Sequence, residues 1–472
     1  MDEADASAIS FGTDGWRATL AEFTESRVRM VGQAVASYLD DEGIDGPVAV
    51  GYDARETSPD FASAIADVLA ANGRDVVLSE RDCPTPVLAW TVAAGDYAGG
   101  VMLTASHNPP EYNGVKFLPG DGAPALPAVT DAVVSRLAEP EGDDADAGAI
   151  EERDLVGPYL DHALSHVDAS LDGVTVAYDA MHGSGRGVTD ALLERAGADV
   201  VRLRCERDPD FGGGAPEPEA ERVPDLIERV TEGDADLGVV NDGDADRIGV
   251  VTPDRGYLDP NHFLAATYEY LLDDRGRAVG DADRAGGGDV VRTVSTSSLV
   301  DRVAEAHGNA VHETAVGFKW VARAMAEYDA LLGGEESGGF GLGGHLRNKD
   351  GVLFALVAAA ADAERAFDER VDALAAQHGE IHQDRVSVDC PDDRKQPVLD
   401  ALADELPETV AGVAVARVND VDGFKVILAD DTWLLMRPSG TEPKLRIYAE
   451  ALSGDRVDDL LEAGENLVEP LV

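Results

Sequence analysis

Two polar loops of this chain carry residue types that together could perform metal-assisted phosphoryl transfer. The loop 104–109 (Thr-Ala-Ser-His-Asn-Pro) follows an apolar run and places the hydroxyl of Ser106 beside His107. The loop 241–247 (Asn-Asp-Gly-Asp-Ala-Asp-Arg) follows another apolar run and offers alternating carboxylates and an arginine. A serine hydroxyl needs a base, a metal or a charged neighbour before it acts as a nucleophile, and hard carboxylate oxygens suit Mg²⁺. We therefore expect transfer through a phosphoserine at Ser106.

Two other functional motifs do not fit these loops, and an ordinary turn remains the alternative for each. Ser106 lacks the Gly-x-Ser-x-Gly elbow that positions the nucleophile of many hydrolases, so a hydrolase triad is disfavoured. The acidic loop is not an EF-hand, because Arg247 stands where that motif needs glycine and Pro253 where it needs a bidentate glutamate. An ordinary turn at 104–109 and a solvated acidic turn at 241–247 are the alternatives that spacing alone leaves open.

Two later segments carry residues that could bind a phosphorylated sugar. The loop 333–339 contains Gly-Glu-Glu-Ser-Gly-Gly, and its paired polar side chains could hold sugar hydroxyls. The segment 437–446 (Arg-Pro-Ser-Gly-Thr-Glu-Pro-Lys-Leu-Arg) combines arginine, hydroxyls and glycine amides in one turn, as a phosphate cradle requires. Taken alone, neither segment identifies a ligand.

The size and composition of the chain predict a cytoplasmic protein of several domains. At 472 residues, 44% of them hydrophobic, the chain is too long for one ordinary core and predicts three or four domains. It has no run of about 18 apolar residues that would span a membrane, and its acidic start does not resemble a signal peptide. Cys83, Cys205 and Cys390 lie too far apart to predict a metal motif or a disulfide framework.

The charge balance is strongly acidic, with 92 acidic and 38 basic residues and a net charge of -54. A nucleic-acid or anionic-membrane partner is disfavoured, because phosphate groups require a basic face. In molar salt the Debye length is about 3 Å, so self-repulsion is screened, and we interpret the carboxylates as an adaptation to high salt. The few remaining lysines are expected where chemistry requires them: Lys116, Lys319, Lys349, Lys395, Lys425 and Lys444.

The pattern of strands and helices repeats three times before the last part of the chain. Short apolar runs predict buried strands, and apolar residues at helical spacing predict the helices between them. Each repeat ends in a polar loop beyond a strand, which is where ligands bind in α/β sheets. The predicted strands are 47–51, 75–78, 98–103, 174–178, 200–203, 237–240, 289–293, 310–313 and 330–332, with helices at 87–93, 188–195, 223–230, 298–306, 318–327 and from Ser58.

Shifts in composition divide the chain into four predicted domains. The acidic, glycine-rich stretch 138–148 predicts a linker. Further boundaries are expected near Gly256 and within 370–382, after an alanine-rich helix. The predicted domains are 1–148 with the phosphoserine loop, 149–255 with the metal loop, 256–372 with the sugar loop, and 373–472, an α+β domain with the phosphate cradle.

The four loops, in this order and with this spacing, resemble those of the α-D-phosphohexomutases, the phosphoglucomutase/phosphomannomutase family. The resemblance covers essentially the whole chain and includes the motifs at 11–17 (Phe-Gly-Thr-Asp-Gly-Trp-Arg), 113–117 and 316–320. It implies a four-domain, heart-shaped fold with three related α/β domains and a smaller C-terminal α+β domain around one cleft. Together with the acidic composition, it suggests a source among halophilic archaea.

The resemblance also implies a role for each matching residue. Ser106 would carry the phosphoryl group and, with Asp242, Asp244 and Asp246, contact Mg²⁺. A hexose 1,6-bisphosphate would be both the intermediate and the activator. The partner would be a small phosphosugar, bound by a monomer or small homo-oligomer. The other matching residues would surround the substrate. Those that line the cleft would be Arg17, Lys116, Arg247 and Lys319, and those that hold the sugar would be Glu335 and Ser337. Those that bind the non-reacting phosphate would be Arg437, Ser439, Gly440, Thr441 and Arg446.

One departure from the family pattern leaves the general base open. Several members have a histidine directly after Gly-Glu-x-Ser-Gly, where this chain has Gly339. The next histidine is His345 in the segment 343–350, which resembles a variant of the motif. His345, Lys116 and His107 are the candidates for the base.

The sugar is also open at this point. The Glu-Glu-Ser loop favours glucose and mannose phosphates, because members that act on aminosugars more often have Glu-Gln-Ser-Gly-His. A phosphoglucosamine mutase is the first alternative and a phosphoserine-based sugar phosphatase the second. A catalytically silent paralogue that only binds sugar phosphates is the third, and the complete Asp triplet argues against it.

Overall fold

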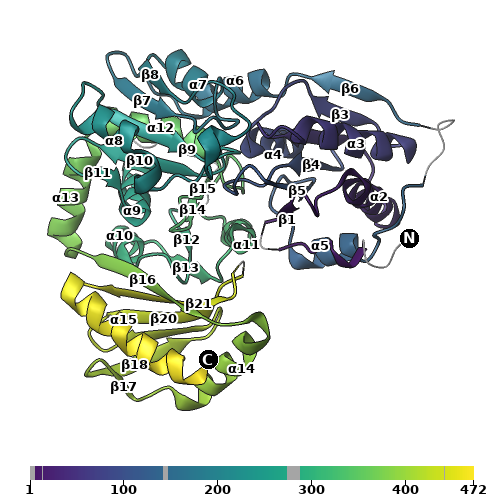
Figure 1. Cartoon of the computed structure of the whole chain (residues 1–472). Coiled ribbons are helices and arrows are strands. Elements are labelled where there is room, and N and C mark those ends of the chain that lie inside the picture. The colour runs from purple at the N-terminus through teal and green to yellow at the C-terminus, as the bar shows by residue number, and fades with distance from the viewer. Residues whose placement is uncertain (1–5, 13, 142–146, 274–286, 441) are drawn as a thin grey trace.

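The structure, a computed structural model, contains four sheets that follow one another along the chain, each at the centre of one domain (Figure 1). Domains I, II and III are α/β units, and domain IV at the C-terminus is α+β, so the predicted four-domain architecture is confirmed. Thr441 and part of the predicted linker lie outside the described residues. The structure describes residues 6–12, 14–141, 147–273, 287–440 and 442–472.

Domain I is built on a mixed sheet whose central parallel strands are buried along nearly their whole length, as expected where helices cover both faces. Its last strand follows the predicted linker, so this sheet extends beyond residue 148. In spatial order the strands are β1 (Trp16–Thr19), β5 (Tyr112–Pro119), β4 (Gly99–Leu103), β2 (Val48–Tyr52), β3 (Val76–Ser79) and β6 (Ile150–Arg153). The helices are α2 (Glu25–Asp41), α3 (Ser58–Ala71), α4 (Thr85–Ala94) and α5 (Pro127–Val134).

Domain II repeats this plan with five strands. In spatial order they are β11 (Gly256–Leu258), β10 (Ile248–Thr252), β9 (Leu237–Asn241), β7 (Thr175–Asp179) and β8 (Asp199–Leu203). The helices are α6 (Val156–His166), α7 (Thr189–Arg195) and α8 (Pro224–Thr231), with short 3-10 turns at η2 (Phe211–Gly213) and η3 (Ala220–Arg222).

Domain III has a smaller sheet of the same kind. Its strands, in spatial order, are β13 (Val311–Thr314), β12 (Val290–Thr293), β14 (Leu332–Gly334) and β15 (Phe340–Leu342). The strand predicted at 330–332 is therefore two residues early at both ends. The helices are α9 (Pro260–Leu272), α10 (Leu299–His307), α11 (Phe318–Tyr328), α12 (Gly351–Glu364) and α13 (Phe367–His378).

Domain IV is an antiparallel sheet covered by helices. In spatial order its strands are β16 (His382–Asp389), β21 (Lys444–Ala451), β20 (Trp433–Pro438), β19 (Phe424–Leu428), β18 (Val413–Asn419) and β17 (Thr409–Val410). The helices are α14 (Asp392–Glu405) and α15 (Gly454–Val468), followed by the 3-10 turn η5 (Glu469–Leu471).

The three predicted functional loops occupy the same position in their three domains. Each leaves the carboxyl end of a strand that pairs in parallel with its neighbour (β4, β9 or β14) and returns along an antiparallel strand (β5, β10 or β15). The sequence predicts the first strand and the loop, but the returning strand was not anticipated. This repeated hairpin places one reactive loop from each domain at the end of its sheet.

The alanine-rich helix α12 ties domain III to domain II. Every residue from 351 to 361 is buried, as expected of a helix that is apolar on all sides. The helix belongs to the third repeat by sequence, yet it packs against α7, β9 and β10 of the second. The metal loop and the sugar loop are thereby carried on one continuous core.

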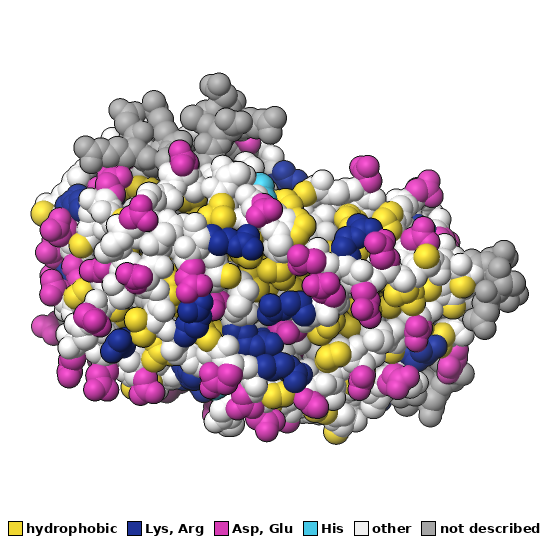
Figure 2. Space-filling model, turned by 90° about the horizontal axis from the view of Figure 1, so that it is seen from above, with side chains coloured by type: hydrophobic (Ala, Val, Ile, Leu, Met, Phe, Trp, Pro, Cys, Tyr) yellow, Lys and Arg dark blue, Asp and Glu magenta, His cyan; other side chains and the backbone are white. Residues whose placement is uncertain are grey.

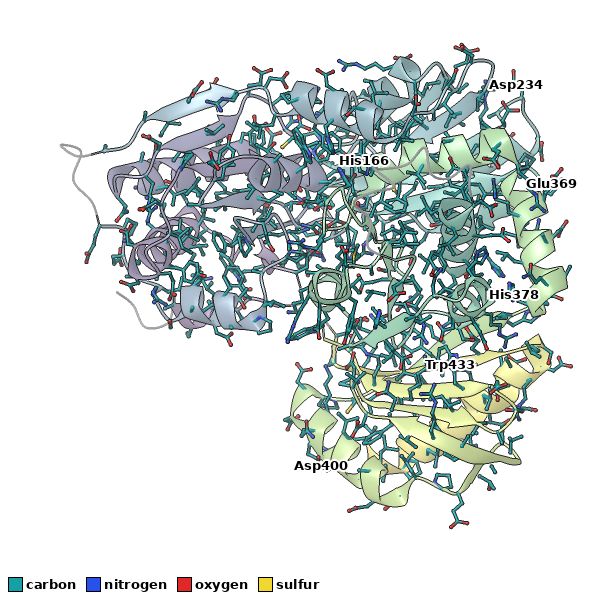
Figure 3. The ribbon with its side chains drawn as sticks, turned by 180° about the vertical axis from the view of Figure 1, so that it is seen from behind. His166, Asp234, Glu369, His378, Asp400 and Trp433 are labelled. Carbon is teal, nitrogen blue, oxygen red and sulfur yellow. The ribbon has the colours of Figure 1, made fainter. Side chains whose placement is uncertain are left out.

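Domain IV is attached to domain III through a few polar contacts and one apolar patch. Trp433, marked in Figure 3, packs with Val294 across this boundary and donates through Nε1 to Glu450 over 2.8 Å. Glu450 also accepts a hydrogen bond from the backbone nitrogen of Ser298 at 3.1 Å.

Within the described residues, none of the helices combines the length and apolarity needed to cross a bilayer.

Candidate active site

Ser106 lies in the loop between β4 and β5, and one buried arginine fixes the shape of this loop. The guanidinium of Arg55 donates to the backbone carbonyls of Ser106 (2.9 Å), Asn108 (2.6 Å), Pro109 (2.7 Å) and Tyr112 (3.0 Å). Ser106 itself has a φ of 51°, in the left-handed region that a non-glycine residue adopts only at a cost. The loop therefore presents its serine in a conformation that the surrounding structure imposes.

The acidic loop between β9 and β10 lies directly against the serine loop. Ser106 Oγ donates to Asp242 Oδ2 over 2.8 Å. A Cβ atom at Gly243 would lie 2.6 Å from the carbonyl oxygen of Ser106, so only glycine permits this approach. At the start of α4, Thr85 donates through Oγ1 to Asp244 Oδ2 over 2.6 Å and through its backbone nitrogen to the Asp244 carbonyl. The two loops identified first in the sequence are thus brought together.

The three carboxylates of the acidic loop form a cluster that fits a hard divalent cation. Asp242, Asp244 and Asp246 are buried, and each offers an oxygen within 4.8 Å of the others. The Oδ1 atoms of Asp244 and Asp246 are buried and have no hydrogen-bond donor among the described residues, which is costly unless a cation contacts them. Burial and the two neighbouring carboxylates raise the pKa of Asp242 well above its ordinary value. An all-oxygen donor set of this kind suits Mg²⁺.

Two buried lysines face the same carboxylates. Lys116 Nζ lies 2.9 Å from Asp244 Oδ2 and 3.0 Å from Asp246 Oδ2, and Lys349 Nζ lies 2.8 Å from Asp246 Oδ2. Both lysines also contact Asp14, at 2.8 Å and 3.5 Å respectively. Burial opposes the charge of Lys116, but the three carboxylates prevail and hold its pKa well above the ordinary value. Lys116 is therefore paired with carboxylates from two domains.

His107 adjoins the nucleophile in space as well as in sequence. Its Nδ1 lies 3.3 Å from Ser106 Oγ, and its Nε2 lies 4.0 Å from Glu217 Oε1. Burial, followed by the positive charges of Arg247 and Arg17, lowers the pKa of His107 well below its ordinary value. The imidazole is thus neutral at pH 7 and keeps one nitrogen that can accept a proton.

The predicted sugar loop between β14 and β15 is fastened to the acidic loop. The backbone nitrogen of Ile248 donates to the carbonyl of Gly338 over 3.0 Å, and Arg247 forms an isolated antiparallel bridge with Gly339. The backbone nitrogen of Arg247 also donates to Asp242 Oδ1 over 3.0 Å. Arg247, predicted to lie in the cleft, therefore connects the metal loop and the sugar loop.

The three polar side chains of the sugar loop have different surroundings. Glu335 is buried, accepts a hydrogen bond from the backbone nitrogen of Gly317 at 2.9 Å, and has its pKa raised by burial to about 7. Glu336 accepts hydrogen bonds at 2.7 to 3.3 Å from hydroxyls of the segment 293–296, inside domain III. Ser337 is exposed. Glu336 thus serves the packing of its own domain.

The remaining predicted cleft residues also reach this junction. Arg17 Nη2 donates to Asp14 Oδ2 over 3.0 Å, and its Nη1 donates to Asn108 Oδ1 over 3.3 Å. Lys319, at the start of α11, donates to the carbonyl of Gly12 over 3.5 Å, and burial lowers its pKa. Domain III therefore meets the first motif of domain I here.

His345, one of the three candidates for the general base, is not brought to the nucleophile. Its Nε2 lies 2.8 Å from Asp350 Oδ2, and its Nδ1 lies 2.9 Å from His162 Nε2, so other groups contact both ring nitrogens. The segment 343–350 bends so that Lys349, and not His345, faces the Asp triplet. The expectation that His345 could act as the base is corrected by this geometry.

The predicted phosphate cradle connects β20 and β21 in domain IV. Arg437 is buried, and its Nε donates to Asp422 Oδ2 over 3.0 Å. Lys395, on α14, donates from Nζ to the backbone carbonyls of Ser439 and Glu442, both over 2.6 Å. A buried arginine side chain and a turn held by a lysine from another element form the frame of this cradle.

The other predicted cradle residues are more open. Gly440 is exposed, and Thr441 lies outside the described residues. Arg446 is half-buried and donates to Glu442 Oε2 over 2.9 Å. Arg437, Ser439 and Arg446 are thus placed around one turn, as the sequence predicts.

Three residues at the junction of domains I, II and III are not among the predicted site residues: Arg55, Asp14 and Lys349. Asp14 stands inside the motif 11–17 and Lys349 inside 343–350, so both belong to motifs that the sequence indicates without giving these side chains a role. The scarcity of lysine was a usable signal for Lys349. No pattern in the sequence distinguishes Arg55 from the other arginines.

Comparison with known protein families accounts for nearly the whole chain. Residues 8–143, 157–256 and 259–378 match the models of alpha/beta/alpha domains I, II and III of phosphoglucomutase/phosphomannomutase, and residues 386–466 match the model of its C-terminal domain. The four matches occur in the same order as the four observed domains.

Relatives and solved structures agree with these matches over full length. A "probable phosphoglucosamine mutase" from Methanopyrus kandleri is 33% identical, covering 98% of both chains. A phosphoglucomutase/phosphomannomutase from Thermococcus kodakarensis is 32% identical, covering 97% of this chain and 98% of its own. The crystal structure of a Thermus thermophilus protein assigned as a phosphomannomutase superposes with a TM-score of 0.80 at 32% identity, covering 98% of this chain and 99% of its own.

Proposed function

Because this chain belongs to the phosphoglucomutase/phosphomannomutase family, we propose that Ser106 transfers a phosphoryl group between the 1- and 6-positions of a hexose. The protein is a phosphohexomutase, an intramolecular phosphotransferase. The observation that supports the role of Ser106 most directly is its 2.8 Å contact with Asp242 inside a buried cluster of carboxylates. A nucleophile placed at a cation-binding cluster is what phosphoryl transfer requires.

In the proposed reaction, Ser106 carries the phosphoryl group and donates it to a free hydroxyl of a bound hexose monophosphate. The bond from phosphorus to the serine oxygen breaks, the bond from phosphorus to the sugar oxygen forms, and a hexose 1,6-bisphosphate results. This bisphosphate turns around and its other phosphate returns to Ser106. Mg²⁺ held by Asp242, Asp244 and Asp246 would supply positive charge beside the transferring phosphoryl oxygens.

Lys116 and Lys349 supply fixed positive charge from the protein itself. The pKa of each lysine is raised by the surrounding carboxylates in spite of burial, so both stay charged at neutral pH. Charge that is already in place costs no reorganisation when the transition state forms. A local group of cations is also needed to bind a dianionic sugar phosphate to a protein with a net charge of -54.

We assign the general base to His107 among the three candidates. Its neutral imidazole lies 3.3 Å from Ser106 Oγ, where it can take the serine proton when Ser106 attacks the bisphosphate and return that proton when the serine oxygen is the leaving group. Lys116 is held protonated by three carboxylates, and other groups contact both ring nitrogens of His345.

The sugar and its second phosphate are proposed to bind at the other two loops. Glu335 and Ser337 hold sugar hydroxyls, since Glu336 is used within domain III. The non-reacting phosphate accepts hydrogen bonds from the cradle, where charged donors and backbone amides on one turn suit a phosphate. The cradle consists of Arg437, Ser439, Gly440, Thr441 and Arg446.

Glucose and mannose phosphates are the proposed substrates. The relatives carry different names, among them phosphoglucosamine mutase, phosphoglucomutase/phosphomannomutase and phosphopentomutase, so similarity alone does not select the sugar. The loop of this chain reads Glu-Glu-Ser, whereas aminosugar members more often have Glu-Gln-Ser-Gly-His, and this difference supports the neutral hexoses.

A parallel turnover assay tests this function. The protein, in concentrated KCl with Mg²⁺ and a trace of glucose 1,6-bisphosphate, is given glucose, mannose or glucosamine 1-phosphate, and each reaction is followed by ³¹P NMR. We expect 6-phosphates of glucose and mannose without inorganic phosphate. Conversion of glucosamine 1-phosphate alone would overturn the sugar assignment, and release of inorganic phosphate as the main product would overturn the mutase.

We also propose that this enzyme works in the cytoplasm of a halophilic archaeon, as a monomer or small homo-oligomer. All six lysines are buried or partly buried, so the surface carries none that is fully exposed. Figure 2 shows one face of the molecule, where acidic side chains are scattered widely and Lys and Arg side chains gather near the middle. The negative charges on such a surface repel one another in dilute buffer, and molar salt screens this repulsion.

Circular dichroism during dialysis from concentrated KCl into dilute buffer tests the salt proposal. We expect the native signal and the mutase activity to be lost together as salt is removed. Full activity with an unchanged spectrum in dilute buffer would contradict it.

A further inference from the structure

Three histidines gather where α6 meets the segment 343–350, outside the catalytic loops. His162 and His166 are four residues apart on α6 and so share one face of the helix. His345 lies opposite them, and Figure 3 shows His166 close to α12, which begins just after this segment. The ring centroids are 5.1 Å apart for His162 and His345, 5.3 Å for His166 and His345, and 5.4 Å for His162 and His166.

These spacings match those of imidazoles around a tetrahedral metal ion. Zinc–nitrogen bonds are about 2.0–2.1 Å, which puts each ring centroid about 3 Å from the metal and neighbouring centroids about 5 Å apart. Two ligands at positions i and i+4 of a helix are a common part of such sites. The three rings therefore already have the separation that a three-histidine site needs.

Asp350 orients the ring of His345 toward the cluster. It accepts hydrogen bonds from His345 Nε2 (2.8 Å), from the hydroxyl of Tyr159 (2.8 Å) and from the backbone nitrogen of Leu353 (2.8 Å). Because Nε2 donates to Asp350, Nδ1 of His345 carries the lone pair, and it is directed at His162 Nε2, 2.9 Å away. A carboxylate behind a histidine ligand is the usual outer partner of a metal-bound imidazole.

We propose that His162, His166 and His345 form a binding site for a divalent transition-metal ion of the zinc class, separate from the Asp triplet. Among the described residues only the Asp triplet already has its ligand atoms within 4.8 Å of one another, so binding requires the ring of His166 to turn toward the other two. His166 is the last residue of α6 and is only partly buried, which allows that rotation.

The state and the setting of His162 favour this role. Nε2 of His162 donates to His345 Nδ1, so a change of tautomer that moves this proton to Nδ1 of His162 leaves both facing nitrogens able to bind a metal ion. Trp90 stacks on the same ring, with centroids 4.9 Å apart, and limits its movement. Imidazole nitrogens select zinc, nickel or copper, whereas Mg²⁺ prefers the oxygen donors of the Asp triplet.

An ion at this site would join domain II to domain III. His162 and His166 belong to the first helix of domain II, and His345 belongs to the segment that also carries Lys349. A ligand that binds only the folded state stabilises it according to its concentration and affinity. The bound ion therefore raises the melting temperature and holds in place the segment that positions Lys349.

Equilibrium dialysis of the full chain tests the proposal. The chelator-treated protein, in molar potassium salt with saturating Mg²⁺, is dialysed against Zn²⁺, and bound zinc is measured. We expect one equivalent for the wild type, at least a tenfold loss of affinity in His162→Gln and His166→Ala, and no loss in the control His312→Gln, whose ring stacks on Tyr328 in another part of domain III.

Two further measurements, Co²⁺ spectra and melting temperatures, test the metal site independently of the dialysis. Co²⁺ added to the wild type should give the intense visible bands of a tetrahedral site, which needs no variant to fold. Zinc should raise the melting temperature of the wild type and of His312→Gln but not of His166→Ala. The absence of zinc binding by the folded wild type, octahedral Co²⁺ bands, or equal binding by His166→Ala would each overturn the site.

Discussion

The junction of domains I, II and III and the phosphate cradle of domain IV are held in place in different ways. At the junction, charged side chains bond across all three domains: Lys116 of domain I and Lys349 of domain III both contact Asp246 of domain II. In the cradle, Arg437 bonds to Asp422 of its own domain. The reacting groups are thus assembled by three domains at once, whereas the cradle is a turn whose side chains bond within the fourth domain.

The contacts between domain IV and domain III explain how the cradle could move independently of the junction. Asp422, which holds Arg437, also accepts a hydrogen bond from the backbone nitrogen of Val316 in domain III at 3.1 Å. Lys425 reaches Glu313 of domain III over 2.8 Å. A change in how domain IV sits on domain III would therefore move the cradle without disturbing the triplet. Chemistry and phosphate binding can therefore be altered separately, which the following substitutions test.

The largest effect is expected at the nucleophile. Ser106→Ala removes the atom that carries the phosphoryl group, and we expect mutase turnover to fall by at least about a thousand-fold. The fold should persist, because the loop is shaped by Arg55 through backbone carbonyls and not through the serine side chain. Coupled assays of kcat with circular dichroism check this, and near-normal turnover would remove Ser106 from its role.

Lys116→Met tests whether the junction is one charged unit. It removes a buried cation from between three carboxylates, and breaking such a buried pair costs about 3–5 kcal/mol of unfolding free energy. Denaturant unfolding measures the loss. Lys444→Met, which affects a partly exposed lysine of domain IV, is the matched control and should cost about 1 kcal/mol or less. Equal losses in the two variants would contradict the comparison.

Glu335→Gln tests the buried carboxyl of the sugar loop through pH. Its folded pKa of about 7 lies above the ordinary value of 4.5, so the native state binds the extra proton and the wild type loses stability as pH rises from about 4.5 to about 7. The shift corresponds to about 3 kcal/mol. Denaturant unfolding of both proteins between pH 5 and 8 should show the wild type losing stability relative to the variant. Parallel curves would show that Glu335 is not buried as described.

Arg437→Ala should weaken substrate binding and leave the chemistry largely intact. Loss of a charge-assisted hydrogen bond to phosphate costs about 1.5–3 kcal/mol, which is roughly a 10- to 150-fold increase in KM. Arg456→Ala, a control on α15 of the same domain, should leave KM unchanged. An unaltered KM in Arg437→Ala, or a loss confined to kcat, would show that the cradle does not bind the phosphate independently.

The sequence predicts most of the junction because its chemistry lies in short motifs. The Ser106 and Asp242 loops each follow a buried strand, and their meeting follows from their positions at the ends of two related sheets. The returning antiparallel strands were missed, because an apolar run such as 248–252 does not by itself indicate its direction. The burial of α12 against domain II was also out of reach, since it depends on packing between repeats.

Individual side chains were harder to place than loops. His345 and Lys349 are four residues apart in one motif, and sequence favoured the histidine because imidazoles are common bases. The bend of this segment turns the lysine to the triplet and the histidine to Asp350, and only three-dimensional packing decides that choice. Arg55 was missed for the same reason, because its partners are backbone carbonyls that carry no residue signature.

Phosphorylation of Ser106 in the wild-type chain can be measured directly. The protein is incubated with Mg²⁺ and glucose 1,6-bisphosphate, quenched, and mapped by peptide mass spectrometry before and after a chase with excess glucose 1-phosphate. We expect one phosphoryl group on the peptide containing Ser106, which the chase removes as the bisphosphate forms again. A phosphoryl group on another residue, or an unmodified Ser106 peptide in an enzyme that turns over, would contradict it.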